Sequence, residues 1–250
     1  MGYTIALAGK GGTGKTTLAA LLVRLLKEKK KGSILAVDAD PNSNFAEALG
    51  LTTQQNVGRL LDDLAQHPEK IPAGTPKSRF IEYEVQTAIA EGNGFDVLTM
   101  GRPEGPGCYC YVNNVLREVM AKLIKDYDYV IIDNEAGLEH LSRRTTRSAD
   151  ILLVVSDATI AGLKAAKRIK EIVQELDIKT KKNLLLINRA QKNMDTAKIS
   201  GVGLDYIGGL PFDEAISALS LNGNSLWELK DNSASLVALR KLGERLWPLN

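Results

Sequence analysis

Residues 9–17 read Gly9-Lys10-Gly11-Gly12-Thr13-Gly14-Lys15-Thr16-Thr17, and this stretch decides the predicted fold. An apolar run precedes it and a leucine-rich helical pattern follows it. In such a strand–turn–helix context, Gly-x-x-x-x-Gly-Lys-[Ser/Thr] is typical of a phosphate-binding loop, or P-loop. The alternative is a glycine-rich turn that only packs a strand against a helix, but that alternative does not require the lysine and threonine. We therefore predict a nucleotide-binding protein.

Each residue type in the loop has an expected task. Glycines let successive backbone N–H groups point at phosphate oxygens, and the positive end of the following helix adds to that field. Lys15 would reach the β- and γ-phosphates, and the Thr16 hydroxyl would bind Mg²⁺. The residues expected to surround the phosphates are Gly11, Gly12, Thr13, Gly14, Lys15, Thr16 and Thr17.

Length and composition fit one large α/β domain over residues 1–250. Charged residues make up 25% and hydrophobic residues 44%, which is ordinary for a globular protein. A net charge of +2 gives no reason to expect nucleic acid as a partner. No apolar run is long enough to span a bilayer and no signal peptide is visible, so we expect a cytoplasmic protein.

Apolar runs rich in Val, Ile and Leu recur along the chain, each near a helical pattern. Continuous apolar strands are typical of a sheet covered on both faces, and alternating strands and helices indicate a doubly wound, mostly parallel sheet of about seven or eight strands. The expected strands are residues 3–8, 33–37, 95–100, 129–132, 151–155, 184–187 and 206–210.

Carboxylates follow two of these strands. Asp38 and Asp40 end the second run, and Asp133 ends the run 129–132. Because ligands of open α/β sheets bind beyond the carboxyl ends of strands, these side chains should face the phosphates. An apolar strand that ends in Asp is the Walker B pattern, whose carboxylate holds Mg²⁺. A helix cap is the alternative task for such an Asp.

Lys10 is a second lysine inside the loop. With it, the loop resembles the deviant Walker A motif of the MinD/ParA/nitrogenase iron protein class of ATPases, which dimerise around nucleotide. The resemblance implies that Lys10 reaches the partner's phosphates, as an arginine finger does. It also implies that Asp38 and Asp40 form a first switch, with Asp40 orienting the attacking water. Residues 133–137 match the second switch, although Asn134 and Glu135 depart from the usual Asp-Thr-Pro-Ala-Gly.

The resemblance also extends to the base. Asn188 and Arg189 match the strand-end Asn-Arg that faces adenine in these ATPases, and Pro211 lies in the matching loop 209–213. Asn188 could instead cap a turn. No Asn-Lys-x-Asp of the guanine-binding kind is present, so ATP is the expected nucleotide.

The two cysteines, Cys108 and Cys110, form a Cys-x-Cys pair. An intrachain disulfide between them would be strained, and a four-ligand metal site needs two more ligands. Two copies of the pair across a two-fold axis would supply four thiolates, which suit Zn²⁺, Ni²⁺ or Cu⁺. The alternative is a pair of small buried side chains.

Residues 102–110 and 136–141 narrow the resemblance to CooC-type ATPases, which assist nickel insertion into carbon monoxide dehydrogenase. This implies a homodimeric metallochaperone that closes with ATP and binds nickel at the cysteines. The nitrogenase iron protein is disfavoured because it needs two well-separated cysteines per subunit. Two alternatives stay open: an acetyl-CoA synthase maturation ATPase, and a MinD/ParA-like positioning ATPase.

The end of the chain predicts an amphipathic helix over residues 235–247, with leucines on one face and basic residues elsewhere. Such a helix could bind a membrane surface, but docking on its own domain is the commoner arrangement, and we expect docking.

Overall fold

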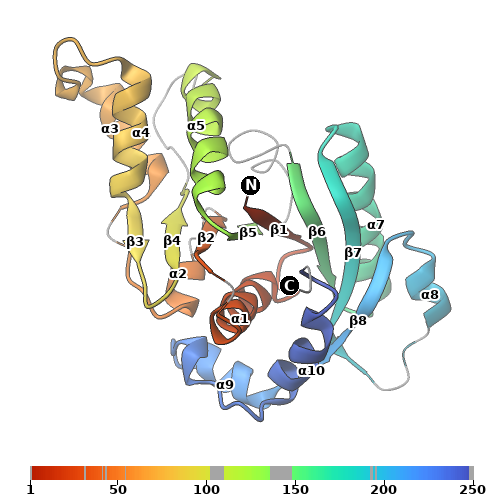
Figure 1. Ribbon diagram of the computed structural model, residues 1–250. Helices are drawn as coiled ribbons and strands as arrows, with labels where there is room; N and C mark the ends of the chain where they lie inside the picture. Colours follow the sequence, from red (N-terminus) through yellow and green to blue (C-terminus); the bar gives the residue numbers. More distant parts are fainter. Residues whose placement is uncertain are drawn as a thin grey trace.

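The computed structural model describes residues 2–30, 32–40, 42, 44–53, 55–101, 110–135, 148–191, 194 and 196–247, without the side chains of residues 110–113 and 196. The described residues confirm an α/β fold (Figure 1). Eight strands form one sheet in the order β3-β4-β2-β5-β1-β6-β7-β8. Every neighbouring pair is parallel except β3 and β4. The strands are β1 (Tyr3–Ala8), β2 (Ile34–Ala39), β3 (Ile89–Glu91), β4 (Asp96–Thr99), β5 (Tyr129–Asn134), β6 (Ser148–Ser156), β7 (Lys179–Ala190) and β8 (Asp205–Pro211).

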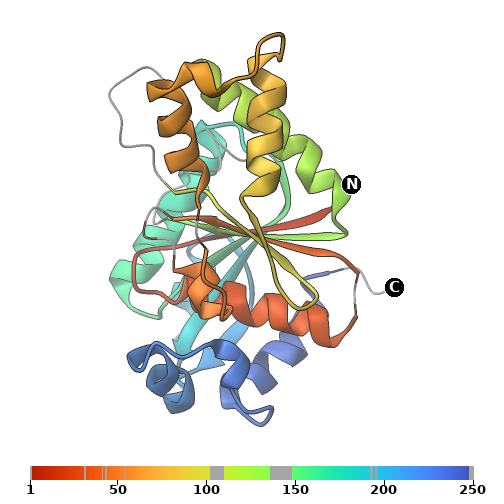
Figure 2. The same cartoon turned by 90° about the vertical axis from the view of Figure 1, so that its left-hand side faces the viewer.

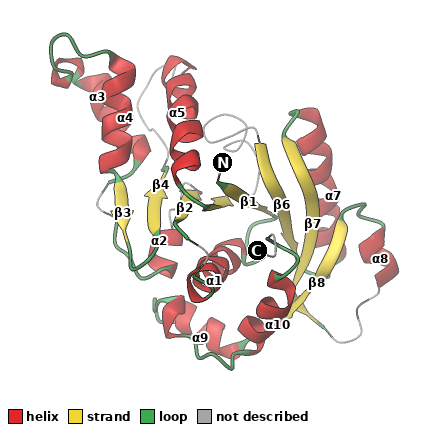
Figure 3. Ribbon diagram, viewed as in Figure 1, coloured by secondary structure: helices red, strands yellow, loops and turns green. Residues whose placement is uncertain are grey.

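Helices cover both faces of the sheet (Figures 2 and 3). The helices are α1 (Lys15–Glu28), α2 (Phe45–Ala48), α3 (Val57–Gln66), α4 (Lys77–Thr87), α5 (Cys110–Leu123), α7 (Ile160–Glu175), α8 (Thr196–Ser200), α9 (Glu214–Leu221) and α10 (Ala234–Gly243). The described residues also include the short 3₁₀ turns η1 (Pro68–Lys70), η2 (Ile124–Asp126) and η3 (Leu226–Glu228). The sheet separates α1, α2 and α10 from α3, α4, α5, α7 and α8.

Strand β2 shows how the sheet supports two hydrophobic cores. All six of its residues are buried. Because successive side chains point to opposite faces, Leu35 and Val37 join the core under α3, α4 and α5, while Ile34 and Ala36 join the core under α1 and α10. A central parallel strand buried on both faces needs an unbroken apolar run, which is the pattern that the sequence shows.

The C-terminal helix docks on its own sheet, as expected. Leu236 and Leu239 of α10 are fully buried, and Leu246 beyond its end is fully buried as well. These side chains pack in the core that contains α1 and β8. The helix ends at Gly243, earlier than the expected residue 247, and residues 244–247 continue as turns.

One strand was missed. Strand β3 has three residues, only partly buried or exposed, and pairs antiparallel with β4 at one edge of the sheet. An edge strand of this length carries no apolar run that could predict it. Strand β7 is also longer than the expected 184–187, because its first half carries lysines and threonine that are polar yet paired with β6.

Candidate functional site

The carboxyl ends of β1, β2 and β5 meet at one edge of the sheet, and the P-loop follows β1 there. Asp38 and Asp133 are direct neighbours across the β2–β5 pair, and Leu7 lies beside Asp133 across the β1–β5 pair. In a parallel sheet, side chains at the same level point to the same face. Asp38 and Asp133 therefore project together toward the α1 side, where the P-loop begins its helix.

At Gly9 and Gly14 of the P-loop, the backbone lies so close to neighbouring atoms that a side chain would not fit. A Cβ on Gly9 would lie 2.2 Å from the carbonyl oxygen of Val155, so the loop passes directly over the end of β6. Gly14 has a φ of 88° immediately before α1, and a Cβ there would lie 2.4 Å from Nδ2 of Asn188. These residues hold the loop close to β6 and β7 in a backbone shape that favours glycine.

At the start of α1, Lys15 contacts the loop and Thr16 contacts the end of β5. The Lys15 side chain is buried, and its Nζ lies 3.5 Å from the carbonyl oxygen of Lys10. The Thr13 hydroxyl donates to that same oxygen at 2.8 Å and helps to close the turn. The Thr16 hydroxyl donates to Oδ2 of Asp133 at 2.6 Å. The first turn of α1 is thereby joined to the end of β5, across 117 residues of sequence.

Asp133 is a buried carboxylate, and one of its two oxygens is without a hydrogen-bond partner among the described residues. Its Oδ1 has no hydrogen-bond partner among the described residues, and the side chain is 1% exposed. Burial raises the pKa of Asp133 to about 6, against the opposing hydrogen bond from Thr16 and the positive charge of Lys15. A buried carboxylate oxygen without a donor is a place where a cation would be favourable.

Asp38 accepts hydrogen bonds from two backbone N–H groups and adds a second buried carboxyl group beside Asp133. Its Oδ2 accepts from the N–H of Phe45 at 2.9 Å, and its Oδ1 accepts from the N–H of Asp40 at 3.2 Å. Burial raises the pKa of Asp38 to about 7, and the nearby charges of Asp133 and Asp40 act in the same direction. Asp38 thus holds the first backbone N–H of α2. Asp40 is partly exposed and accepts from the N–H of Asn42 at 2.9 Å.

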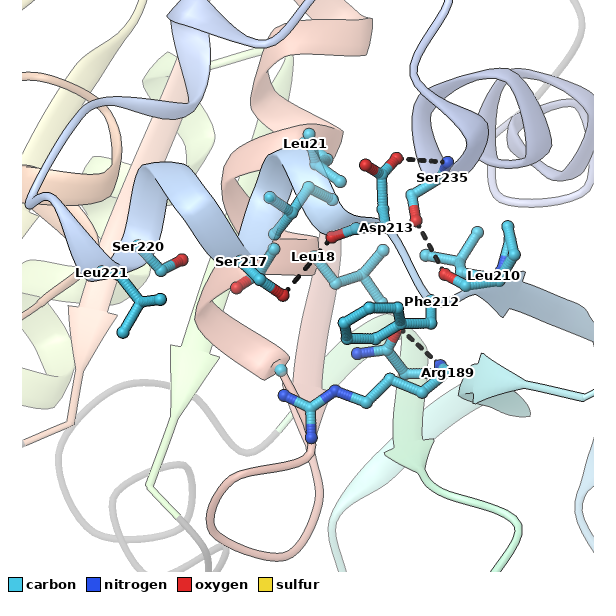
Figure 4. Close-up of a pocket in the computed structure, with 15 residues that line it drawn as sticks. Leu18, Leu21, Arg189, Leu210, Phe212, Asp213, Ser217, Ser220, Leu221 and Ser235 are labelled. Atoms are coloured by element: carbon cyan, nitrogen blue, oxygen red, sulfur yellow. Dashed lines mark hydrogen bonds between the residues drawn. The ribbon is translucent and has the colours of Figure 1, made fainter.

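A cavity of about 320 Å³ lies on the α1 side of the P-loop (Figure 4). Its wall is mostly apolar with a few hydroxyl and amide groups, the usual character of a small-molecule site. It is built from α1, the end of β7, the end of β8, α9 and the start of α10. Its lining residues are Gly14, Thr17, Leu18, Leu21, Asn188, Arg189, Leu210, Pro211, Phe212, Asp213, Ile216, Ser217, Ser220, Leu221 and Ser235.

Asn188 connects this cavity to the P-loop. Its Nδ2 donates to the carbonyl oxygen of Thr13 at 2.8 Å, and its Oδ1 accepts from the N–H of Arg189 at 2.9 Å. Arg189 has a φ of 52°, and its side chain is exposed at the cavity. Asn188, within β7, therefore supports the P-loop through the Thr13 carbonyl oxygen and also lines the cavity.

The structure brings together most of the residues selected from the sequence. Thr17, Asn188, Arg189 and Pro211 line the cavity, while Lys15, Thr16 and Asp133 lie next to one another at the P-loop. The Lys10 side chain is exposed on the loop, as are Gly11 and Gly12.

The proposed thiolate site cannot be placed in the same way. Cys108 lies outside the described residues, and of Cys110 only its place at the start of α5 is described. Among the described residues there is no group of three or more His, Cys, Asp and Glu that could hold a metal ion. None of the helices within those ranges is long and apolar enough to cross a bilayer.

Sequence reasoning missed the contribution of α9 and α10 to the cavity. Ser217 and Ser220 lie on α9, and Ser235 lies in the first turn of α10. No motif marks these serines. The one usable signal is Asp213, an Asp directly before a helical pattern, which predicts an N-cap and so the start of α9.

The chain is similar in sequence to known ATP-binding proteins over nearly its whole length. The AAA domain family matches residues 2–186. An uncharacterized ATP-binding protein of Methanocaldococcus jannaschii is 42% identical over 247 residues, which cover 97% of this chain and 97% of that protein. The carbon monoxide dehydrogenase accessory protein CooC of Rhodospirillum rubrum is 30% identical over 261 residues, which cover 98% of this chain and 97% of that protein.

A solved structure shares the fold. The septum site-determining protein MinD of Pyrococcus horikoshii, complexed with Mg-ADP, matches with a TM-score of 0.70 and 22% identity. The match covers 98% of this chain and 96% of that chain. Given the P-loop with its second lysine, the strand-end carboxylate beside it and these matches over nearly the whole length, the chain belongs to the MinD/ParA class of P-loop ATPases.

Proposed function

We propose that this protein binds and hydrolyses Mg-ATP with the P-loop edge of the sheet. The observation that carries this proposal is the Thr16–Asp133 contact, in which a hydroxyl and a buried carboxylate meet at 2.6 Å with one carboxylate oxygen left without a partner among the described residues. Oxygen ligands of this kind are those that Mg²⁺ prefers. Thr16 and Asp133 would hold the ion, directly or through water. When bound, Mg²⁺ supplies charge neutralisation at the β- and γ-phosphates.

The chain's own residues divide the remaining work. The N–H groups of residues 11–17 surround the phosphates, and Lys15 binds the β- and γ-phosphate oxygens. Asp40 directly follows β2 at this edge of the sheet, and its negative charge contributes to the raised pKa of Asp133. We assign Asp40 the task of orienting the attacking water, and Asp38 the task of holding the loop that carries Asp40.

The cavity of Figure 4 is the proposed base site. It opens beside Gly14 and Thr17, directly next to where the phosphates would lie. Asn188, Arg189 and Pro211 line it and are assigned to the adenine base. Because the P-loop, β7, β8 and α10 all contribute to this one proposed nucleotide site, we assign residues 1–250 to a single ATPase domain.

We further propose that the protein is a homodimeric metallochaperone for nickel in carbon monoxide dehydrogenase maturation, located in the cytoplasm. Identity of 30% to CooC over nearly the full length of both chains supports this client, as does the Cys108-x-Cys110 pair. The exposed Lys10 is available to reach the phosphates of a second subunit. ATP would close the dimer and bring the two cysteine pairs together, and hydrolysis would reopen it.

Metal titration tests the chaperone half. Wild type should bind about one Ni²⁺ or Zn²⁺ per dimer, since four thiolates complete one tetrahedral site, and the affinity should change with ATP. Cys108→Ala/Cys110→Ala should abolish this binding. His67→Ala is the matched control, because His67 is exposed and carries the other common nickel-binding side chain. Equal stoichiometry in wild type and the cysteine variant would refute a cysteine metal site.

Two variants test the ATPase half. Asp40→Asn should keep Mg-ATP binding but lower the rate of phosphate release by about 10²-fold, because only the orientation of water is lost. Lys10→Ala should keep nucleotide binding to the monomer and lose ATP-dependent dimerisation on gel filtration. A variant of Lys10 that dimerises like wild type would contradict the role across the interface.

A MinD-like positioning ATPase is the alternative from another class, and acetyl-CoA synthase is the alternative client. Membrane binding through the C-terminal helix is disfavoured because Leu236 and Leu239 are fully buried against the sheet. Lipid sedimentation with and without ATP tests the first alternative. Pull-down with each of the two client enzymes separates the second.

A further inference from the structure

Asp213, at the junction of β8 and α9, makes more contacts than a helix cap requires. Its Oδ1 accepts from the N–H of Ala215 at 3.1 Å, which is the ordinary N-cap contact for α9. Its Oδ2 accepts from the N–H of Ser235 at 2.9 Å and from the Ser233 hydroxyl at 2.5 Å. Ser233 is itself the N-cap of α10, where its hydroxyl accepts from the N–H of Leu236. A single carboxylate thus holds the amino ends of two helices.

Both of these helix ends form the wall of the base cavity. Ile216 and Ser217 of α9 line one part of it, and Ser235 of α10 lines another (Figure 4). The Ser235 hydroxyl donates to the carbonyl oxygen of Pro211 at 2.9 Å, so α10 is also joined to the end of β8. The spacing of α9 and α10 across the cavity therefore depends on Asp213.

The electrostatics favour an ionised carboxylate at this junction. Partial burial alone would raise the pKa of Asp213, but the hydrogen bonds from Ser233, Ser235 and Ala215 outweigh it and lower the pKa below its ordinary value. The amino ends of α9 and α10 also carry partial positive charge, which stabilises an anion. Charge-assisted hydrogen bonds are stronger than neutral ones. The Asp213 carboxylate therefore holds α9 and α10 together in the absence of a ligand.

We propose that Asp213 is a positioning residue for the nucleotide base: its carboxylate sets the width of the base cavity by joining α9 to α10, and it leaves the phosphate half untouched. This inference rests on the proposed ATP site. It predicts that loss of Asp213 weakens binding of the base and ribose but not binding of phosphate groups. A role in overall stability alone would weaken both equally.

Calorimetric titration with Mg-ADP and with Mg-pyrophosphate separates these cases, since pyrophosphate carries the phosphates without the base. Asp213→Ala should lower the affinity for ADP roughly tenfold, the effect of losing charge-assisted hydrogen bonds, with pyrophosphate affinity unchanged. Asp213→Asn should be intermediate, because one amide oxygen can still accept from one of the two helices. Glu214→Gln is the matched control: the neighbouring exposed residue loses the same charge, and both affinities should stay at wild-type values.

The outcomes are distinct. Equal losses for ADP and pyrophosphate, or no loss for either, would overturn the positioning role. If Asp213→Ala does not fold, Ser233→Ala removes one of the three donors, and a few-fold loss restricted to ADP is then expected; an unchanged ADP affinity in that variant would overturn the role. A wild-type protein that binds pyrophosphate but neither ADP nor ATP would instead refute the proposed function.

Discussion

Each half of the proposed nucleotide site contains a carboxylate, and the pKa values of these two carboxylates are shifted in opposite directions. At the phosphate half, Asp133 is buried with one oxygen lacking a partner among the described residues, and burial raises its pKa to about 6. At the base half, Asp213 accepts from Ala215, Ser233 and Ser235, and these hydrogen bonds lower its pKa despite partial burial. One oxygen of Asp133 lacks a donor among the described residues at the place where a cation is expected, whereas both oxygens of Asp213 accept hydrogen bonds.

This difference indicates what each half needs from its ligand. The phosphate half holds neighbouring buried carboxylates, Asp38 and Asp133, that are costly to ionise without a cation. The base half is held by hydrogen bonds within the protein, so it can be formed before the nucleotide binds. We therefore expect the phosphate half to depend on Mg²⁺ and pH, and the base half to depend on the integrity of its hydrogen bonds.

The largest expected effect is at Lys15. Lys15→Ala removes the buried cation beside the phosphates, and the rate of ATP hydrolysis should fall by about 10²-fold or more. Phosphate release under saturating Mg-ATP measures this effect. Lys164→Ala, an exposed lysine on α7, should leave the rate unchanged. A Lys15 variant with nearly wild-type turnover would mean that the P-loop is not the hydrolytic centre.

Thr16→Val comes next. It keeps the shape of the side chain and removes the hydroxyl that contacts Asp133, so Mg-dependent binding should weaken by roughly tenfold. The measurement is the ADP affinity with Mg²⁺ and with excess chelator, and the difference between the two should shrink in this variant. In Thr17→Val, whose parent side chain lines the base cavity, the Mg²⁺ dependence should persist. Loss of Mg²⁺ dependence in both variants would count against a specific role for Thr16.

The raised pKa values predict how stability depends on pH. The folded, nucleotide-free protein keeps protons on Asp38 and Asp133 up to about pH 7 and about pH 6, whereas the unfolded chain loses them near the ordinary value of 3.8. The folded state binds more protons in this window, so the contribution of these groups to the free energy of unfolding falls as pH rises from about 4 to about 7. For Asp213, whose pKa is lowered, the contribution is instead lost as pH falls below its ordinary range.

Asp133→Asn tests this dependence, because the amide does not titrate. Between pH 5 and pH 7.5, wild type should lose on the order of 1 kcal/mol more unfolding free energy than the variant, since each unit of pKa shift corresponds to about 1.4 kcal/mol. Urea denaturation at the two pH values gives the comparison. Asp205→Asn, at an exposed position on β8, should show the wild-type slope. Parallel pH profiles for wild type and Asp133→Asn would argue that the carboxylate is not held out of water.

The smallest expected effect concerns the link between the halves. Asn188→Ala removes the hydrogen bond to the Thr13 carbonyl oxygen, and the affinities for ADP and pyrophosphate should both fall about two- to tenfold. This pattern differs from that of Asp213→Ala, which should affect ADP alone. Asn183→Ala, on the same strand but away from the P-loop, is the control. An effect on ADP affinity alone would mean that Asn188 serves the base without supporting the P-loop.

The phosphate half was largely predictable, because its residues follow from local sequence. Residues 9–17 are contiguous, and Asp133 ends an apolar strand, so the topology of a parallel sheet brings them to one edge. The base half was predicted only in part. Asn188, Arg189 and Pro211 were found through family resemblance, whereas Ser217 and Ser235 carry no local signal and line the cavity only because α9 and α10 pack beside α1.

Strand β3 was missed, and the predicted β7 was too short, for a related reason. Edge pairing in β3 and the polar first half of β7 are stabilised by backbone hydrogen bonds to a neighbouring strand, which any side chain permits. Apolar periodicity detects burial and not pairing, so it underestimates such segments.

By itself, the sequence determined the class of sheet, the P-loop motif with its second lysine and the carboxylate at the end of β5, because each depends on residues adjacent along the chain or on one strand. The tertiary structure decided that Thr16 contacts Asp133, that Asn188 supports the loop from β7, and that Asp213 joins two helices 20 residues apart. These contacts depend on the docking of α1, α9 and α10 against the sheet, and docking follows from burial of whole apolar faces. No single residue encodes it.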